Sequence, residues 1–484
     1  MRKINFIVGL LSILGIASNK AASAQSTSPS ATGISEQKVV IVKLDLHPVA
    51  TSEPALQYQL LPPMVQRHPG NAAVSWMVVA AIMPPYFDPK NQETALFEKV
   101  EGQSEASQQA FSPAIAADAI GQFPLGFMDR AARCDTADWG VDRRAGINAL
   151  LPYLNYLRPV ASVLALRARL NISRGDFAEA RQALQSGFSM SQQLTSEPIL
   201  VQDLVSSGIA QLMLTNGVEP WIGGGGPNLY WPLSSLPSPL IDVSSVGETE
   251  RAVLPWTYNR FAKALDGILP TEQWRATLIE MIRIGRTGSP GANKQSSPDE
   301  LSADYERLKQ AIYPKARQQL ELKGLSSKQI DGIPADQAIG EFMVAEYQKR
   351  SDDAWKAWDL PYPISLPILD QNWRESMQGT SDGNALLAFI PNLSRARATF
   401  ARLDQHIAVL RVIEAVRDYA ARHGGRLPST LDQVVDLPVP TDPVTDQPFV
   451  YHLDGKDDGT SATLEPASTK QAFSLSRYQL TIAR

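Results

Sequence analysis

Apolar and polar positions alternate most regularly in residues 138–198, where the pattern predicts two helices that meet at residues 173–177. The first helix has one apolar stripe between arginines, formed by Leu164, Leu166, Leu170 and Ile172. Gly175 is expected to close this helix in the left-handed conformation, and Asp176 to cap the next helix by accepting a first-turn N–H. The pattern therefore predicts an antiparallel helical hairpin.

The second helix of this hairpin has an apolar inner face at Phe177, Ala180, Leu184 and Phe188. Small side chains at Ala168 and Ala180 let the two helices approach closely. The hairpin resembles a tetratricopeptide unit. No second Gly-Asp-aromatic-x-x-Ala pattern follows one period later, so the sequence does not predict an array of repeats.

Most of the remaining chain up to residue 358 is also helical in pattern. Asn71 is placed to cap a helix over residues 72–82, and Pro152 and Pro159 are expected to open or kink helices around residues 143–157. Further helices are predicted at residues 95–103, 114–119, 200–214, 248–265, 271–284, 300–322, 327–330 and 336–358. Residues 38–44 form the first predicted strand, and residues 223–226 and 285–298 are predicted loops.

The pattern changes near residue 392. One long helix is predicted over residues 393–423, closed by Gly424 and Gly425, and short strands follow, among them residues 461–465 and 473–482. The predicted fold class is therefore mainly α, with tetratricopeptide-like helical hairpins and a small C-terminal α+β module. The predicted domains are a helical domain, residues 38–392, and the module, residues 393–484.

The C-terminal segment carries a Gly-Gly-x-Leu-Pro turn at residues 424–428 and an Asp-Pro-x-x-x-x-Pro-Phe-x-Tyr pattern at residues 442–451. This order of helix, turn and short strands resembles the globular part of type II secretion pseudopilins. In those proteins the helix begins as an N-terminal membrane segment, whereas the corresponding helix here is internal and amphipathic. The resemblance implies a role near a pseudopilus and a calcium site in the C-terminal loops.

A second resemblance rests on Asp138-Trp139-Gly140, on Leu151-Pro152-Tyr153-Leu154 and on Pro227-Asn228-Leu229-Tyr230-Trp231. This region is similar to a group of exported planctomycete proteins. That group has no assigned reaction or partner, so the resemblance implies export and no particular activity.

The start of the chain has the pattern of a signal peptide, residues 1–24, with a basic beginning, a short apolar run and a small-x-small site ending at Ala24. Residues 25–37 are rich in small polar residues and predict a flexible leader. No later apolar run is long enough to span a bilayer. We therefore expect a periplasmic or secreted protein without an integral membrane segment in the mature chain.

Charge and cysteine content exclude several classes of function. The 45 basic and 50 acidic side chains nearly balance, so no partnership with nucleic acid is expected. Cys134 is the only cysteine, which excludes intramolecular disulfides, and it is expected to be a small buried residue. The five histidines are scattered without metal-binding spacing, so no cofactor is expected.

The densest charged cluster beside an aromatic side chain consists of Asp138, Trp139, Asp142, Arg143 and Arg144. Its carboxylates have the chemistry for acid-base catalysis, and its arginines have the chemistry to hold an anionic ligand. Helix capping and local ion pairs explain the same residues more simply. The cluster is therefore a candidate interaction site.

A second candidate is a set of three acidic side chains in the C-terminal part: Asp454, Asp457 and Asp458. Carboxylate oxygens are the ligands that calcium prefers, although the spacing is not that of an EF-hand loop. A polar hairpin turn explains the same residues more simply.

We interpret the sequence as that of an exported, non-catalytic envelope scaffold or adaptor that contacts an envelope or secreted protein. Helix pairs recur in binding proteins, although fold analogy alone is a weak argument. The alternatives are an exported, hydrolase-like enzyme with a carboxylate site near Asp138 and Asp142, and a pseudopilus-associated secretion factor.

Overall fold

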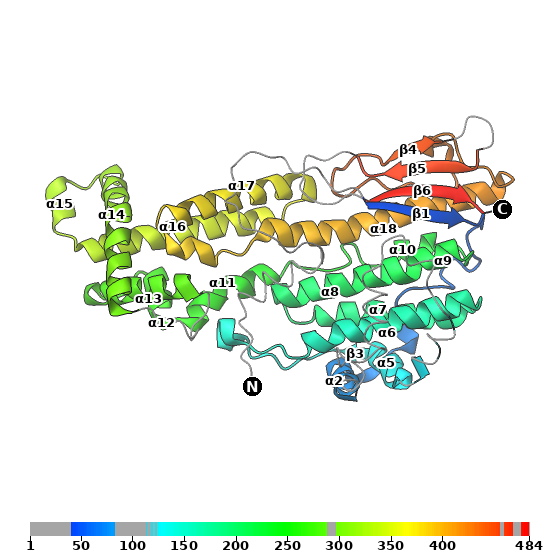
Figure 1. Ribbon diagram of the computed structural model, residues 1–484, viewed down its shortest axis with the longest axis horizontal. Coiled ribbons are helices and arrows are strands. Elements are labelled where there is room, and N and C mark those ends of the chain that lie inside the picture. The colour runs from blue at the N-terminus through cyan, green and yellow to red at the C-terminus, as the bar shows by residue number, and fades with distance from the viewer. Residues whose placement is uncertain are drawn as a thin grey trace, which may run out of the picture. The chain divides into compact units, whose positions relative to one another are not determined.

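The computed structural model describes residues 40–82, 113, 117, 120–121, 123–287, 297–454, 459–467 and 476–483. The described part is mainly helical, with a small sheet built largely from C-terminal strands, so the predicted fold class is confirmed (Figure 1). No helix within these residues is long and apolar enough to cross a membrane. The predicted signal peptide and leader, and the predicted helix over residues 95–103, lie outside the described residues.

Contacts divide the chain into two compact units, each made of separate segments. The described parts of unit 1 come from residues 142–150 and 247–397, and those of unit 2 from residues 40–141, 151–246 and 398–483. We predicted contiguous domains from the sequence. A pattern along the chain does not reveal which distant segments pack together.

The helical hairpin predicted in unit 2 is present as α6 (Leu154–Ser173) and α7 (Phe177–Leu194). Gly175 adopts φ +73°, and Asp176 Oδ1 accepts the Glu179 amide at 3.1 Å, which confirms both predicted end signals. Helix α8 (Leu200–Met213) follows and packs on both. Whether the hairpin is a tetratricopeptide unit stays a prediction.

The remaining elements of unit 2 before residue 246 are short. They are η1 (Met64–Gln66), β2 (His68–Asn71), α2 (Ala72–Ile82), α5 (Leu125–Ala132), β3 (Cys134–Thr136), η5 (Leu214–Val218), α9 (Glu219–Gly223) and α10 (Tyr230–Ser234). Helix α2 begins and ends as predicted, and Asn71 Oδ1 accepts the Ala73 amide at 3.0 Å. Cys134 is buried, as expected, and burial raises the pKa of its thiol.

The four-stranded sheet of unit 2 has the order β1-β6-β5-β4. Its strands are β1 (Val40–Leu46), β4 (Val450–Leu453), β5 (Ser461–Glu465) and β6 (Ser476–Ile482). The strands β4, β5 and β6 are antiparallel, whereas β1 pairs parallel with β6, so that Val40 lies opposite Ser476. The alternation of buried Leu44 and Leu46 with exposed Lys43 and Asp45 shows that one sheet face is solvated.

Helix α18 (Leu393–Arg422) contributes its part from Ala398 onward to unit 2, and buried polar contacts hold it there. Arg417 and Glu414 are fully buried, with Nη1 and Oε2 2.7 Å apart, and Arg417 Nη2 donates to the Gly226 carbonyl at 2.8 Å. Asn228 Nδ2 donates to the Glu414 carbonyl at 2.9 Å. Desolvation by burial raises the pKa of Glu414, although Arg417 opposes this shift.

Unit 1 is built mainly from helices around one apolar core that includes Trp274, Leu278, Ile339 and Met343. Its elements are η4 (Arg143–Asn148), α11 (Val246–Thr257), α12 (Asn259–Leu265), η6 (Thr271–Gln273), α13 (Trp274–Thr287), α14 (Pro298–Leu322), α15 (Ser327–Asp331), α16 (Ala335–Trp358), α17 (Tyr362–Ser381) and η7 (Ala385–Phe389). The predicted helix over residues 248–265 is interrupted at Tyr258, where the backbone is extended.

Residues 143–157, where Pro152 and Pro159 were expected to open or kink helices, form the short η4 and the first turn of α6. Helix α6 begins at Leu154, two residues after Pro152, and Pro159 lies within it. Helix α17 was not predicted at all. Pro361 occupies the N-cap position of this helix and Pro363 lies in its first turn, where the missing N–H costs no hydrogen bond.

Candidate functional site

The predicted interaction cluster is divided between the two units, with Asp138 and Trp139 in unit 2 and Asp142, Arg143 and Arg144 in unit 1. Asn71 fixes the backbone of Asp138: its Oδ1 accepts the Asp138 amide and its Nδ2 donates to the Asp138 carbonyl, both at 2.9 Å. The Asp138 carboxylate accepts the Gly140 amide at 2.8 Å. The Asp138 carboxylate therefore stabilises the turn at residues 138–140 of unit 2.

Trp139 is a core residue. Only 5% of it is exposed, its ring stacks on Tyr153 with centroids 4.6 Å apart, and its Nε1 donates to the Gln193 carbonyl at 2.9 Å. Tyr153 donates in turn to Gln202 Oε1 at 2.8 Å, and burial raises the pKa of its phenol. Trp139 thus anchors the segment before α6 and does not present its ring to a ligand.

In unit 1, Asp142 caps η4 by accepting the Arg144 amide at 3.1 Å. Arg143 and Arg144 are exposed. The capping role that the sequence offered as the simpler explanation is therefore observed for Asp142. Whether the exposed members of the cluster contact a partner stays a prediction.

The possible calcium site cannot be assembled from the described residues, because Asp457 and Asp458 lie outside them. Asp454 is described, and its carboxylate accepts the Thr463 hydroxyl at 2.9 Å. Within the described part of the chain, no group of three or more His, Cys, Asp or Glu side chains lies close enough together to hold a metal ion.

The predicted loop at residues 223–226 is a close-packed turn. Gly226 is buried, and a Cβ added there would lie 2.5 Å from Trp221 Nε1 and 2.7 Å from the Phe177 ring. The Trp221 Nε1 donates to the Pro227 carbonyl at 2.7 Å. The glycine at residue 226 is therefore explained by packing against two aromatic rings, without a phosphate ligand.

Unit 2 contains an open cleft of about 570 Å³ that the sequence pattern did not predict. Six residues from β2, from α5 and its C-terminal cap, and from α7 line it: His68, Pro69, Asp129, Arg130, Arg133 and Gln182. A cleft of this size is in the range that takes a small molecule or a few side chains of a bound peptide.

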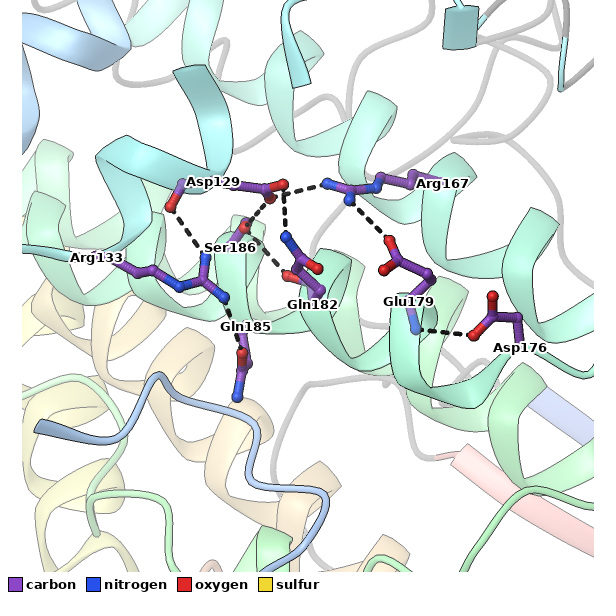
Figure 2. Close-up of polar contacts among 8 residues, drawn as sticks. All are labelled: Asp129, Arg133, Arg167, Asp176, Glu179, Gln182, Gln185 and Ser186. Atoms are coloured by element: carbon purple, nitrogen blue, oxygen red, sulfur yellow. Dashed lines mark hydrogen bonds and ion pairs between the residues drawn. The ribbon is translucent and has the colours of Figure 1, made fainter. Parts of the chain in front are cut away.

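The wall of this cleft contains a polar network centred on Asp129 (Figure 2). Asp129 Oδ1 accepts Arg167 Nη1 at 2.8 Å and the Ser186 hydroxyl at 2.9 Å, while Oδ2 accepts Gln182 Nε2 at 2.8 Å. The side chain of Arg167 is 8% exposed, and its Nη2 lies 3.3 Å from Glu179 Oε2. The Asp129 carboxylate is therefore held by three donors and compensated by the charge of Arg167.

Two further arginines face this cleft. Arg133 donates from Nη1 to the Asp129 carbonyl at 3.0 Å and from Nη2 toward Gln185 Oε1 at 3.4 Å, so its guanidinium is held along the wall (Figure 2). Arg130 is exposed and lies one turn earlier on α5. The neighbouring Asp135 carboxylate accepts the Gly70 amide at 3.1 Å. The side chains that line the cleft thus include two arginines and one carboxylate, and the charge of that carboxylate is already compensated by Arg167.

Comparison with protein families, with curated proteins and with solved structures gives no match for this chain. Its possible function therefore rests on the site itself. The chemistry that the cleft offers is the binding of an anion, because its guanidinium groups can each donate several hydrogen bonds to carboxylate oxygens. The only sequence signal for this site was Arg167, a charged residue within an apolar helical stripe that needs a buried partner.

Proposed function

We propose that this chain is an exported, non-catalytic adaptor whose unit 2 binds an anionic segment of an envelope or secreted protein in the cleft. The observation that supports this proposal is the charge arrangement of the wall. Three donors, Arg167, Gln182 and Ser186, hold the carboxylate of Asp129, whereas Arg130 and Arg133 line the open side. An acidic side chain that enters the cleft therefore meets two arginines, and the one carboxylate among the lining residues is already compensated by Arg167.

The same arrangement is unfavourable for the hydrolase-like alternative. Acid-base hydrolysis by carboxylates needs two such groups that face each other across a substrate. Among the described residues that line the cleft, Asp129 is the one carboxylate, and it accepts three hydrogen bonds. Asp138 and Asp142, which the sequence offered for this role, each accept a backbone amide in a turn or cap.

The test uses the chain without its predicted signal peptide and fluorescein-labelled peptides of about twelve residues in an anisotropy titration. One peptide is rich in Glu and Asp, and its control carries Gln and Asn at the same positions. We expect the acidic peptide to bind and its affinity to fall with added salt, because ionic screening acts over ~10 Å at 0.1 M salt.

Reversing the charge at Arg130 should identify the cleft as the site. We expect Arg130→Glu to weaken binding of the acidic peptide by about tenfold, which corresponds to about 1.4 kcal/mol. Arg174→Glu is the matched control, since Arg174 is an exposed arginine of the same unit that does not line the cleft. Equal binding of the acidic and amide peptides, or equal effects of the two variants, would refute the proposal.

A second candidate function is that of a pseudopilus-associated factor. It is supported by the order of a long helix, α18, followed by the antiparallel strands β4, β5 and β6. The parallel strand β1 is an addition to that order. Cross-linking with purified pseudopilins tests this candidate: a cross-link from α18 or the sheet is expected, and cross-links confined to unit 1 would argue against it.

A further inference from the structure

Helix α2 has an apolar surface on every side. Its inner face is buried, and Trp76 there donates from Nε1 to Gln193 Oε1 at 2.8 Å. Its outer face exposes four apolar side chains at helical spacing: Val74 at 53%, Met77 at 40%, Val78 at 38% and Ile82 at 44%. A helix that is apolar all round is normally buried all round, so this outer face is a surface that lacks the polar residues expected of it.

Helix α5, which carries the cleft residues Asp129 and Arg130, is a neighbour of α2. The two helices pack on each other, and α5 exposes Phe127 to 50%. Arg130 follows three residues later and therefore lies on the same side of α5. Met64 and Val65 are 82% and 93% exposed just before β2, which carries the cleft residues His68 and Pro69. Both α5 and the segment before β2 thus carry exposed apolar side chains close in sequence to their cleft residues.

We propose that the partner segment bound by unit 2 is acidic and amphipathic, with aliphatic side chains on the α2 outer face and Phe127, and carboxylates at Arg130 and Arg133. This inference rests on the proposed function and names the class of its partner. Helix α2 exposes apolar side chains, and its neighbour α5 carries Phe127 and Arg130, so this pair of helices is complementary to a chain that carries aliphatic and acidic residues side by side.

The geometry of Arg133 favours such a segment over a lipid surface. Its guanidinium donates to the Asp129 carbonyl and toward Gln185, so it lies along the wall of the cleft. A guanidinium held in this way can bind a carboxylate that enters the cleft. Binding to the headgroups of a flat bilayer instead requires arginines that project outward from the protein surface. The cleft volume of about 570 Å³ accommodates one or two acidic side chains.

The experiment compares three labelled peptides of about fourteen residues in the same anisotropy assay. The first is a Leu and Glu sequence with apolar residues at helical spacing, the second has the same composition in an order that destroys this spacing, and the third replaces each Glu by Lys. We expect the first to bind at least tenfold more tightly than the second, and the third not to bind.

Variants of the outer face locate the apolar contact. Val78→Glu and Val74→Glu, both at exposed positions of α2, should each weaken binding of the first peptide at least tenfold. Val435→Glu is the matched control, because Val435 is an 83% exposed valine elsewhere in unit 2, and its effect should stay within twofold. Circular dichroism and thermal melting verify that each variant is folded, and the second position keeps the test valid if one variant unfolds.

Four outcomes would overturn the inference. If the α2 variants bind normally while Arg130→Glu does not, the apolar contact is wrong and the proposed function stands. If neither Arg130→Glu nor the α2 variants alter binding, both are wrong. If the unmodified chain sediments as a dimer that Val78→Glu dissociates, the face is covered by a second copy. If it binds phosphatidylglycerol vesicles and none of the peptides, the face meets a membrane.

Discussion

The removal of the Asp129 carboxylate tests how much the polar network in the cleft wall contributes to stability. In Asp129→Ala, the donors of Arg167, Gln182 and Ser186 lose their common acceptor. Gln182 lines the cleft and has access to water, but Arg167 is only 8% exposed and keeps one partner, Glu179, at 3.3 Å. The variant therefore leaves a largely buried guanidinium with a single, half-exposed counter-charge.

The size of the effect follows from these exposures. Breaking a fully buried ion pair by removing one partner costs about 3–5 kcal/mol. Because the Asp129 side chain is 16% exposed and Glu179 remains, we expect about 2–3 kcal/mol for Asp129→Ala. Asp129→Asn keeps the shape and the acceptor oxygen for Arg167, so about 1 kcal/mol is expected for it. Asp135→Ala is the control, since Asp135 is an exposed carboxylate nearby that accepts the Gly70 amide.

The measurement is the shift of the urea midpoint of unit 2, combined with hydrogen exchange of amides in α5, α6 and α7. Each kcal/mol lost from the free energy of unfolding lowers the melting temperature of a unit of this size by roughly 2–4 °C. The expected order of destabilisation is Asp129→Ala, then Asp129→Asn, then Asp135→Ala. The reasoning is refuted if Asp129→Ala is as stable as Asp135→Ala, because the network would then be no more than a surface arrangement.

Three further predictions concern other parts of unit 2. Gly226→Ala should destabilise by about 1–3 kcal/mol, because its Cβ would meet Trp221 and Phe177, whereas Gly208→Ala, with no atom within 4 Å of its Cβ, should stabilise α8 by about 0.5–1 kcal/mol; thermal melting of both decides. Asp176→Ala should cost about 1 kcal/mol through loss of the α7 cap, and Asp176→Asn should retain most of it; equal melting temperatures for the two would contradict the capping role. Because burial raises the pKa of Glu414 above its ordinary value of 4.5, the folded chain holds a proton that the unfolded chain releases, so stability falls as pH rises from 4.5 to the raised value. Glu414→Gln should flatten this part of the pH profile of urea midpoints, and an unchanged profile would contradict it.

Features encoded by adjacent residues were predictable from the sequence. The cap of α2 by Asn71, the cap of α7 by Asp176 and the left-handed Gly175 each depend on a few consecutive positions, so the sequence pattern predicts them directly. Helix α17 was missed for a related reason: its prolines lower the local propensity, while the packing that compensates comes from distant residues.

The candidate site was not predictable, because its parts come from separate elements. Asp129 is on α5, Arg167 on α6 and Gln182 on α7, and the sequence pattern of each helix is explained without the others. The pairing of β1 with β6 is a second case, since a strand pattern predicts extended backbone but not the partner strand. The clusters that the sequence did highlight, around Trp139 and around Gly226, are in the structure packing and capping elements.

The parallel pairing of β1 with β6 also has a consequence for how the chain acquires its fold. Val40 is synthesised long before Ser476, and at typical rates of about 5–20 residues per second the strand β1 waits roughly 20–90 s for its neighbour. During that time the edge of β1 that later pairs with β6 stays unpaired. The waiting strand carries Lys43 and Asp45 on one side, and such charges oppose its pairing with other exposed strands before β6 arrives.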